Sequence, residues 1–247
     1  MTGSELTGGE RLKDMDILDD QVSRLRALDS CAVSDALDSR GLPSAVGGLR
    51  PLAAQRPTAG RAVTVLLGVP AATSGAPSPS APSPGAPKRH LSTAAVDASG
   101  PGDVIVVAHQ GRTDCAGWGG LLSRAAVIRG IDGVVVDGAA RDLAEATAVG
   151  LPVFASASTA VTARGRAVEV SWGEPVEFAG VPVAPGDLVL ADAGGVVIIP
   201  SAHAETVLAT AERIAATEAA MAAALDAGRP VSEVMGATYE ELTEEQH

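Results

Sequence analysis

The residues with the clearest potential for chemistry are adjacent in the chain, at Arg141 and Asp142. The planar guanidinium group of an arginine offers a fork of donors that suits a carboxylate or a carbonyl oxygen. An aspartate beside it can hold a hard divalent cation such as Mg²⁺, directly or through water. A carboxylate at a helix N-terminus with a surface ion pair is the common structural alternative. The pair alone leaves both interpretations open.

A glycine-rich turn upstream of this pair is suited to binding an anion. It consists of Gly119, Gly120, Leu121 and Leu122. Backbone N–H groups at the start of a helix have no intrahelical acceptor, and the helix dipole there favours negative charge. Close packing of the two glycines is the alternative explanation. The turn is therefore a candidate anion-binding site.

Three side chains that precede the turn are weaker candidates. Asp114 could act as a base or hold a water molecule, and a structural role is its alternative. His109 is interpreted as a strand-end residue rather than a base. Cys115 has no nearby histidine in the sequence, which argues against a thiolate nucleophile.

The lysine content narrows the mechanism. The chain contains only two lysines, Lys13 in a polar N-terminal segment and Lys88 at the edge of a Pro/Ser-rich segment. A Schiff-base enzyme needs a desolvated lysine in a pocket, and neither position suits one. Carbanion chemistry in this chain would therefore need a metal as the electron sink.

The elements around these residues are expected to bring them together. A helix begins at the glycine-rich turn and ends at Gly130, and a buried strand follows from Gly133 to Val136. A second turn at Asp137-Gly138 then delivers Arg141 and Asp142 to the start of another helix. Two helix N-termini would lie near the carboxyl end of one strand, where open α/β sheets commonly bind ligands.

The rest of the chain predicts one α/β domain from residue 19 to 234. Residues 1–18 are expected to be a flexible lead-in, 70–88 a Pro/Ser/Ala-rich loop and 235–247 an acidic tail. Expected helices cover 19–28, 30–40, 90–98 and 202–227, and expected strands cover 61–67, 104–108, 152–155 and several short segments between 167 and 200.

The overall composition excludes several classes of protein. The net charge of −12 argues against a nucleic-acid-binding groove. No apolar run approaches the roughly 18 residues that would suggest a membrane span. Two cysteines are too few for a disulfide framework, and the polar, acidic N-terminus is unlike a signal peptide. A cytoplasmic protein is expected.

The spacing of these residues resembles that of the regulator of RNase E activity A-like family, which includes the 4-hydroxy-4-methyl-2-oxoglutarate and 4-carboxy-4-hydroxy-2-oxoadipate aldolases. The aldolase branch is marked by a glycine, twenty residues, Arg-Asp, two residues and an acid. Gly120, Arg141, Asp142 and Glu145 satisfy that spacing. Further similar segments occur in order from about residue 20 to 230, such as Pro101-Gly-Asp-Val and Leu151-Pro-Val-Phe-Ala.

The resemblance implies an α/β fold, namely a β/β/α three-layer sandwich of the swivelling phosphohistidine-domain type, with flanking helices and a long C-terminal helix. It implies assembly as a homotrimer or homohexamer. By the same resemblance Arg141 would hold the oxygens of the pyruvyl group, and the backbone from Gly119 to Leu122 would bind the substrate carboxylate. Asp142 would bind Mg²⁺ or Mn²⁺, and Glu218 of a neighbouring subunit could be a further metal ligand. Many relatives have Gly-Glu where this chain has Gly119-Gly120.

The resulting hypothesis is a divalent-metal-dependent lyase that acts on a small 2-oxo acid, with neither nucleic acid nor membrane as a partner. Cleavage of the neighbouring C–C bond would leave an enolate, which a metal and Arg141 would stabilise. Retro-aldol cleavage also needs a base, for which Asp114 or a water molecule that it holds is the candidate. Two alternatives stay open: a non-catalytic protein that modulates an RNA-processing enzyme, and a specialised lyase or isomerase that reuses the enolate site.

Overall fold

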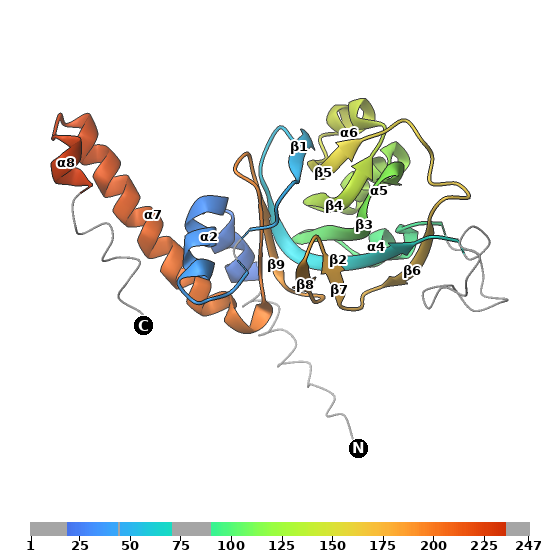
Figure 1. Ribbon diagram of the computed structural model, residues 1–247, viewed down its shortest axis with the longest axis horizontal. Coiled ribbons are helices and arrows are strands. Elements are labelled where there is room, and N and C mark those ends of the chain that lie inside the picture. The colour runs from blue at the N-terminus through green and yellow to red at the C-terminus, as the bar shows by residue number, and fades with distance from the viewer. Residues whose placement is uncertain (1–18, 44, 71–89, 236–247) are drawn as a thin grey trace, which may run out of the picture.

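A single curled sheet forms the centre of the computed structural model, which describes residues 19–43, 45–70 and 90–235 (Figure 1). Its strands are β1 (Arg50–Ala53), β2 (Thr58–Gly68), β3 (Asp103–Trp118), β4 (Gly133–Ala140), β5 (Val153–Ser158), β6 (Val168–Trp172), β9 (Leu188–Ala191) and β10 (Val196–Ile199). A separate hairpin consists of β7 (Val176–Phe178) and β8 (Val181–Val183). The helices are α2 (Ser30–Asp38), α4 (Thr93–Ala98), α5 (Gly120–Arg129), α6 (Leu143–Val149), α7 (Ala204–Asp226) and α8 (Val231–Val234), with a short 3-10 helix η1 (Ser201–His203). Residues 19–25, within the predicted helix 19–28, are also helical.

The strand order in the sheet is β1-β5-β4-β3-β2-β9-β10, with β6 paired to β2. Strands β2, β3, β4 and β5 run parallel to one another, whereas β1, β6, β9 and β10 pair antiparallel to their neighbours. Every residue of β4 is buried, as its run of valines predicts for a parallel strand covered on both faces. Helices α5 and α6 each follow one of the parallel strands, so their N-termini lie at the same edge of the sheet.

Three apolar clusters hold the layers together, and the alternation along β3 separates two of them. Ile105 and Val107 face helices α4, α5 and α6, whereas Val104 and Val106 face the β7–β8 hairpin and the curled end of the sheet. The third cluster joins the outer face of β9 and β10 to α2 and the first turns of α7. The expected mixed α/β fold with a long C-terminal helix is therefore confirmed.

The region before Arg141 differs from its sequence-based prediction in one respect. Asp137-Gly138 is not a turn, because β4 continues through Ala140 and all of these residues are buried. The chain turns only at Asp142, which has the left-handed values φ 56° and ψ 38° and precedes the first residue of α6. The valine run marked the start of the strand, but small residues at its end gave no signal that it continued.

Helix α7 packs against α2 along its first turns only and then extends away from the sheet, with α8 at its tip (Figure 1). Within the described ranges, no helix is both long enough and apolar enough to cross a membrane. The predictions for residues 1–18, for the loop at 71–88 and for most of the acidic tail concern residues outside those ranges.

Candidate active site

Two helix N-termini meet at the edge of the sheet where β3 and β4 end. Trp118 of β3 is paired with Ala140 of β4, and the Arg141 N–H donates to the Trp118 carbonyl at 3.0 Å. These contacts place the start of α5 next to the turn at Asp142. Residues that are about twenty positions apart in the sequence therefore lie in contact.

The Asp142 carboxylate connects the two helices. Its Oδ2 accepts from the backbone N–H of Gly120 at 3.2 Å and from Arg141 Nε at 3.0 Å. The Gly120 N–H and then the Arg141 guanidinium hold the pKa of Asp142 below its usual value. Its Oδ1 has no donor within the described part of the chain. One oxygen thus orients the carboxylate, and the other is available to a ligand.

Arg141 is oriented in a similar way. Its Nε binds Asp142, while neither terminal nitrogen contacts an acceptor among the described residues. The side chains of Arg141 and Asp142 are 35% and 41% exposed, so the two do not form a buried structural pair. The fork of the guanidinium group is therefore open to a carboxylate or carbonyl oxygen from solution.

Gly120 is required by the space that Glu145 occupies. A Cβ atom at Gly120 would lie 2.1 Å from Glu145 Oε2 and 3.0 Å from Asp142 Cβ. The other oxygen, Glu145 Oε1, accepts from Arg124 Nε at 3.3 Å. The glycine and the acid of the sequence motif thus lie against each other, and the absence of a Cβ atom at position 120 leaves room for Glu145.

The first turn of α5 has the properties expected of an anion site. Gly119 is its N-cap in an extended conformation, and its side chain-free Cα leaves room for Asp142 and Arg141. The N–H groups of Leu121 and Leu122 have no acceptor within the described ranges, as is usual at a helix start. Leu122 packs against the core, whereas Leu121 is 81% exposed.

The residues present fit a divalent cation of the Mg²⁺ type that keeps most of its water. The free Oδ1 of Asp142 supplies one hard oxygen ligand, and the described residues contain no group of three or more His, Cys, Asp or Glu side chains suited to a metal. Mg²⁺ is typically bound through one or two carboxylates, with water and substrate completing its octahedral shell.

Asp114 lies in an irregular part of β3, apart from these contacts. Gln110 and Gly111 have positive φ, and the strand register shifts between Arg112 and Ala116. Both oxygens of Asp114 accept from Arg112, at 3.0 and 2.7 Å. The Arg112 guanidinium lowers the pKa of Asp114, which weakens it as a base. No contact joins it to Arg141 or Asp142 among the described residues.

Glu218 is carried by the part of α7 that projects from the body, on the other side of the molecule from α5 and α6 (Figure 1). It is partly exposed. It is therefore not part of the site that its own chain forms, and only a neighbouring subunit's site could receive it.

Comparison with known proteins decides the family. The family model RraA-like (Aldolase/RraA) matches residues 30–198. The chain belongs to the RraA-like family. The matched segment includes the whole of α5, β4 and α6, and hence Gly120, Arg141, Asp142 and Glu145.

Two relatives illustrate the range of this RraA-like family. A Halalkalibacterium halodurans protein named "Putative 4-hydroxy-4-methyl-2-oxoglutarate aldolase" is 32% identical over 194 residues, covering 78% of this chain and 83% of that protein. Protein DlpA of Legionella pneumophila is 28% identical over 222 residues, covering 90% of this chain. The match spans only 34% of DlpA, so this chain corresponds to about a third of that protein.

Solved structures support the same RraA-like fold. An uncharacterized protein from Pseudomonas syringae superposes with a TM-score of 0.76 at 26% identity, over 88% of this chain and 98% of that one. Streptomyces coelicolor RraAS2, described as an unusual member of the RNase ES inhibitor RraA protein family, gives a TM-score of 0.67 at 23% identity, over 86% and 94% of the two chains. The second similarity bears on the fold alone.

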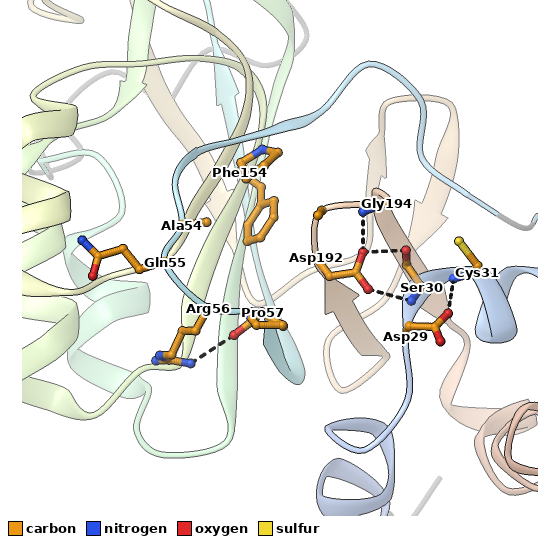
Figure 2. A pocket seen from close by; sticks show the side chains of 12 residues that line it. Asp29, Ser30, Cys31, Ala54, Gln55, Arg56, Pro57, Phe154, Asp192 and Gly194 are labelled. Atoms are coloured by element: carbon orange, nitrogen blue, oxygen red, sulfur yellow. Dashed lines mark hydrogen bonds between the residues drawn. The ribbon is translucent and has the colours of Figure 1, made fainter. Parts of the chain in front are cut away.

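The RraA-like chain also has a cleft of about 400 Å³ between β5, the β1–β2 connection and the start of α2 (Figure 2). The carboxylates of Asp29 and Asp192 in this cleft accept hydrogen bonds from neighbouring groups of the protein. Asp192 accepts from the N–H and Oγ of Ser30 and from the Gly194 N–H, and Asp29 caps α2 through the Cys31 N–H. None of the predicted site residues lines this cleft, and its polar contacts have a structural function.

One contact could not be found from the sequence. Buried His109 lies with its Nε2 3.0 Å from the Cys115 carbonyl oxygen and 3.8 Å from Cys115 Sγ. The expectation that Cys115 has no histidine nearby is therefore wrong, because the irregular part of β3 folds the chain back. Burial raises the pKa of the Cys115 thiol, so the contact does not make it a thiolate nucleophile.

Proposed function

We propose that this RraA-like chain is a divalent-metal-dependent lyase that cleaves a C–C bond next to a 2-oxo acid through a pyruvate-type enolate. Retro-aldol cleavage and oxaloacetate-like decarboxylation both follow this route. The observation that carries the proposal is the contact of Gly120 with Asp142 and Glu145, with Arg141 oriented by the same carboxylate. The aldolase name of the H. halodurans relative points to the same chemistry.

The residues of the chain have distinct roles in this proposal. The open fork of Arg141 binds the 2-oxo acid and shares the negative charge of the enolate. The free N–H groups of Leu121 and Leu122 receive the substrate carboxylate. Asp142 holds the cation through Oδ1, with Mg²⁺ or Mn²⁺ as the proposed metal. When bound, that metal supplies Lewis-acid polarisation of the 2-oxo group.

The proton balance assigns a role to Asp114 in one of the two reactions. In retro-aldol cleavage the 4-hydroxyl loses a proton as the C–C bond breaks, and the enolate carbon then gains one to give pyruvate. Asp114, held by Arg112, takes this proton through a bound water molecule, because no contact joins Asp114 to Arg141 or Asp142 among the described residues. Decarboxylation releases CO₂ and needs only the final protonation.

We further propose that the chain functions as a homotrimer or homohexamer. Helix α5 presents Leu121 and Ile128 to solvent at 81% and 78% exposure, two helical turns apart and hence on one face. Apolar surface of this kind commonly marks a protein contact. A neighbouring subunit's α7 would bring Glu218 to the site, as a further acidic ligand of the metal.

The direct test is pyruvate release from oxaloacetate and from 4-hydroxy-4-methyl-2-oxoglutarate with Mg²⁺, against a reaction without enzyme. Arg141→Ala is expected to lower kcat/KM by about 100-fold or more, as loss of a charge-stabilising donor does. Arg213→Ala, on the exposed surface of α7, is the matched control and should change little. Release at the enzyme-free rate from both substrates, or equal rates for wild type and Arg141→Ala, would refute the proposal.

A further inference from the structure

His109 occupies a slot between the two strands that lead to the proposed site. It lies at the end of the regular part of β3 and is 1% exposed. A Cβ atom at Gly138 of β4 would lie 2.7 Å from its Cδ2, and one at Gly117 of β3 would lie 3.1 Å from it. The two glycines thus make room for the ring, and the ring fills the space between two chain segments.

Both segments continue directly into the site. Gly117 is two residues before Gly119, and Gly138 is three residues before Arg141. The segments are joined again beyond the ring by the Arg141 N–H, which donates to the Trp118 carbonyl. A displacement of the ring would therefore change the position of the α5 turn relative to Arg141.

The hydrogen bonds of the ring identify its protonation state. A carbonyl oxygen only accepts, so His109 Nε2, 3.0 Å from the Cys115 oxygen, must carry the proton and donate. Nδ1 is buried without a partner among the described residues, so a proton there would have no acceptor and the neutral ring keeps a lone pair at this nitrogen. The neutral ring fits this slot, and a second proton would have to enter at Nδ1.

The charges around the ring come from two strands. Arg112 and Asp114 of β3 and Asp137 of β4 act on it electrostatically, and the Cys115 carbonyl accepts from its Nε2. The β7–β8 turn contributes the Ala179 N–H, which donates to the Asp137 carboxylate. Burial lowers the pKa of His109 below the usual 6.5, and the Cys115 carbonyl offsets this only in part. The ring is therefore neutral near pH 7 and becomes charged only in acid.

We propose that the neutral ring of His109 is a positioning residue that holds the Gly117–Gly119 segment against the Gly138–Arg141 segment, so that its protonation disrupts the site. The imidazolium ion would need an acceptor at Nδ1 and would draw the Asp137 carboxylate from the Ala179 N–H. The site would then lose its geometry as the pH falls through the range in which His109 takes up this second proton. The effect on catalysis depends on the proposed lyase function, whereas the effect on the fold does not.

Trp118 provides a readout that is independent of activity. It is buried within the segment that the ring supports, and its Nε1–H donates to Ser123 Oγ at 2.9 Å. The chain has two tryptophans, so Trp172→Phe leaves Trp118 as the only indole. Its fluorescence is expected to change with pH around a single midpoint below 6.5, and His109→Gln in the same background should remove that transition.

His109→Gln is the informative variant because an amide can donate to the Cys115 carbonyl but cannot take up a proton in this range. His203→Gln, at an exposed histidine, is the matched control and should keep the transition. In the lyase assay, His109→Ala is expected to lower kcat/KM by about 10- to 100-fold, because the groups that bind the substrate would be displaced. His109→Gln should recover most of this loss, and its kcat/KM should fall less steeply than that of wild type as the pH is lowered.

The outcomes separate this inference from the proposed function. If His109→Gln keeps the wild-type fluorescence transition, the positioning role is wrong, whatever the activity. If the transition disappears but neither substrate is cleaved, the pH response stands and the lyase proposal fails. If both the transition and the acid limb of kcat/KM depend on His109 with the same midpoint, both are supported.

Discussion

Asp142 and Asp114 differ in what holds each carboxylate, and this difference predicts different mutant phenotypes. Asp142 keeps Oδ1 without a donor among the described residues, whereas Arg112 engages both oxygens of Asp114. Asp142→Asn is a matched variant, because asparagine also tolerates the left-handed backbone at this position. We expect it to abolish binding of Mn²⁺ in a calorimetric titration.

Asp114→Asn should leave Mn²⁺ binding intact and lower kcat for retro-aldol cleavage by about 100-fold, the lower end for general acid–base catalysis. Decarboxylation of oxaloacetate, which needs no base, should change much less. The comparison of the two substrates in steady-state kinetics checks this assignment. An equal loss with both substrates would show that Asp114 supports the fold or the metal instead.

We expect a substitution at Gly120 to lower activity while it leaves stability almost unchanged. Alanine at the first position of α5 favours the helix by up to about 1 kcal/mol, which offsets the crowding of the flexible Glu145 side chain. We therefore expect Gly120→Ala to unfold within a few degrees of wild type, measured by circular dichroism. Its kcat/KM should fall by about tenfold or more, because Glu145 and Asp142 are displaced.

Gly47→Ala is the control, since a Cβ atom there meets nothing within 4 Å. It should leave both quantities unchanged. A Gly120→Ala enzyme with full activity would mean that the close approach of Glu145 has no role in the site.

For individual residues, the sequence predicts which motif residues lie near one another better than it predicts their other side-chain contacts. The spacing of Gly120, Arg141, Asp142 and Glu145 predicted that these residues lie together, and the structure brings them into contact. The Arg124–Glu145 and His109–Cys115 contacts were not predicted. Each depends on how two elements pack or on an irregular strand, and neither leaves a local pattern in the sequence.

The exposed apolar face of α5, formed by Leu121 and Ile128, allows the proposed assembly to be tested. Ile128→Glu places a charge on the apolar face that we propose to lie between subunits, where its burial would be costly. Light scattering after size-exclusion chromatography is expected to show a shift from a trimer or hexamer to a smaller species. Circular dichroism should remain unchanged, because Ile128 contributes little to the core of its own chain.

Ala45→Glu, at an exposed loop position before β1, is the matched control and should keep the wild-type mass. If wild type is already monomeric, or if Ile128→Glu has the wild-type mass, this face is not the subunit contact. A monomeric wild type would also exclude a role for Glu218 from a neighbouring chain.

The elements themselves were largely predictable where hydrophobic period or capping signals are strong. The glycine at position 130 ends α5 as expected, with the left-handed φ of 76° that favours this residue. The continuation of β3 to Trp118 could not be predicted, because Gln110 and Gly111 have positive φ and interrupt the strand pattern. β4 is longer than expected for a related reason, because its final small residues carry no strand signal.

For the molecule as a whole, Asp192 joins the helical layer to the sheet and links stability to pH. Burial alone would raise its pKa, but Ser30 and the N–H groups of Gly194 and Gly195 outweigh burial and lower the pKa below 3.8. A lowered carboxyl pKa stabilises the fold above the unfolded value, and this contribution is lost as the pH falls through the folded value.

We therefore expect Asp192→Asn to lower the free energy of unfolding at pH 7 by about 2 kcal/mol, the scale of a charged hydrogen bond. The variant should also lose less stability than wild type as the pH falls below about 4. Urea unfolding at several pH values measures both effects. Asp226→Asn, at the exposed end of α7, should match wild type; an identical acid dependence in Asp192→Asn would contradict the assignment.

The global arrangement was only partly accessible from the sequence. Alternating strands and helices indicated the α/β class, and the resemblance supplied the layered fold. The antiparallel addition of β9 and β10 to β2, which curls the sheet, joins segments more than a hundred residues apart. Short buried strands such as VVII specify burial but not a partner, so this pairing could not be derived from local patterns.

The central claim is that a 2-oxo acid anion and a divalent cation bind together at Arg141 and Asp142. Calorimetric titration of oxalate, a planar mimic of the pyruvate enolate, in the presence and absence of Mn²⁺ tests it most directly. Tight binding only with Mn²⁺, lost in Asp142→Asn and weakened by about tenfold or more in Arg141→Ala, is the predicted result. Oxalate binding that is unchanged by both substitutions and by the metal would contradict it.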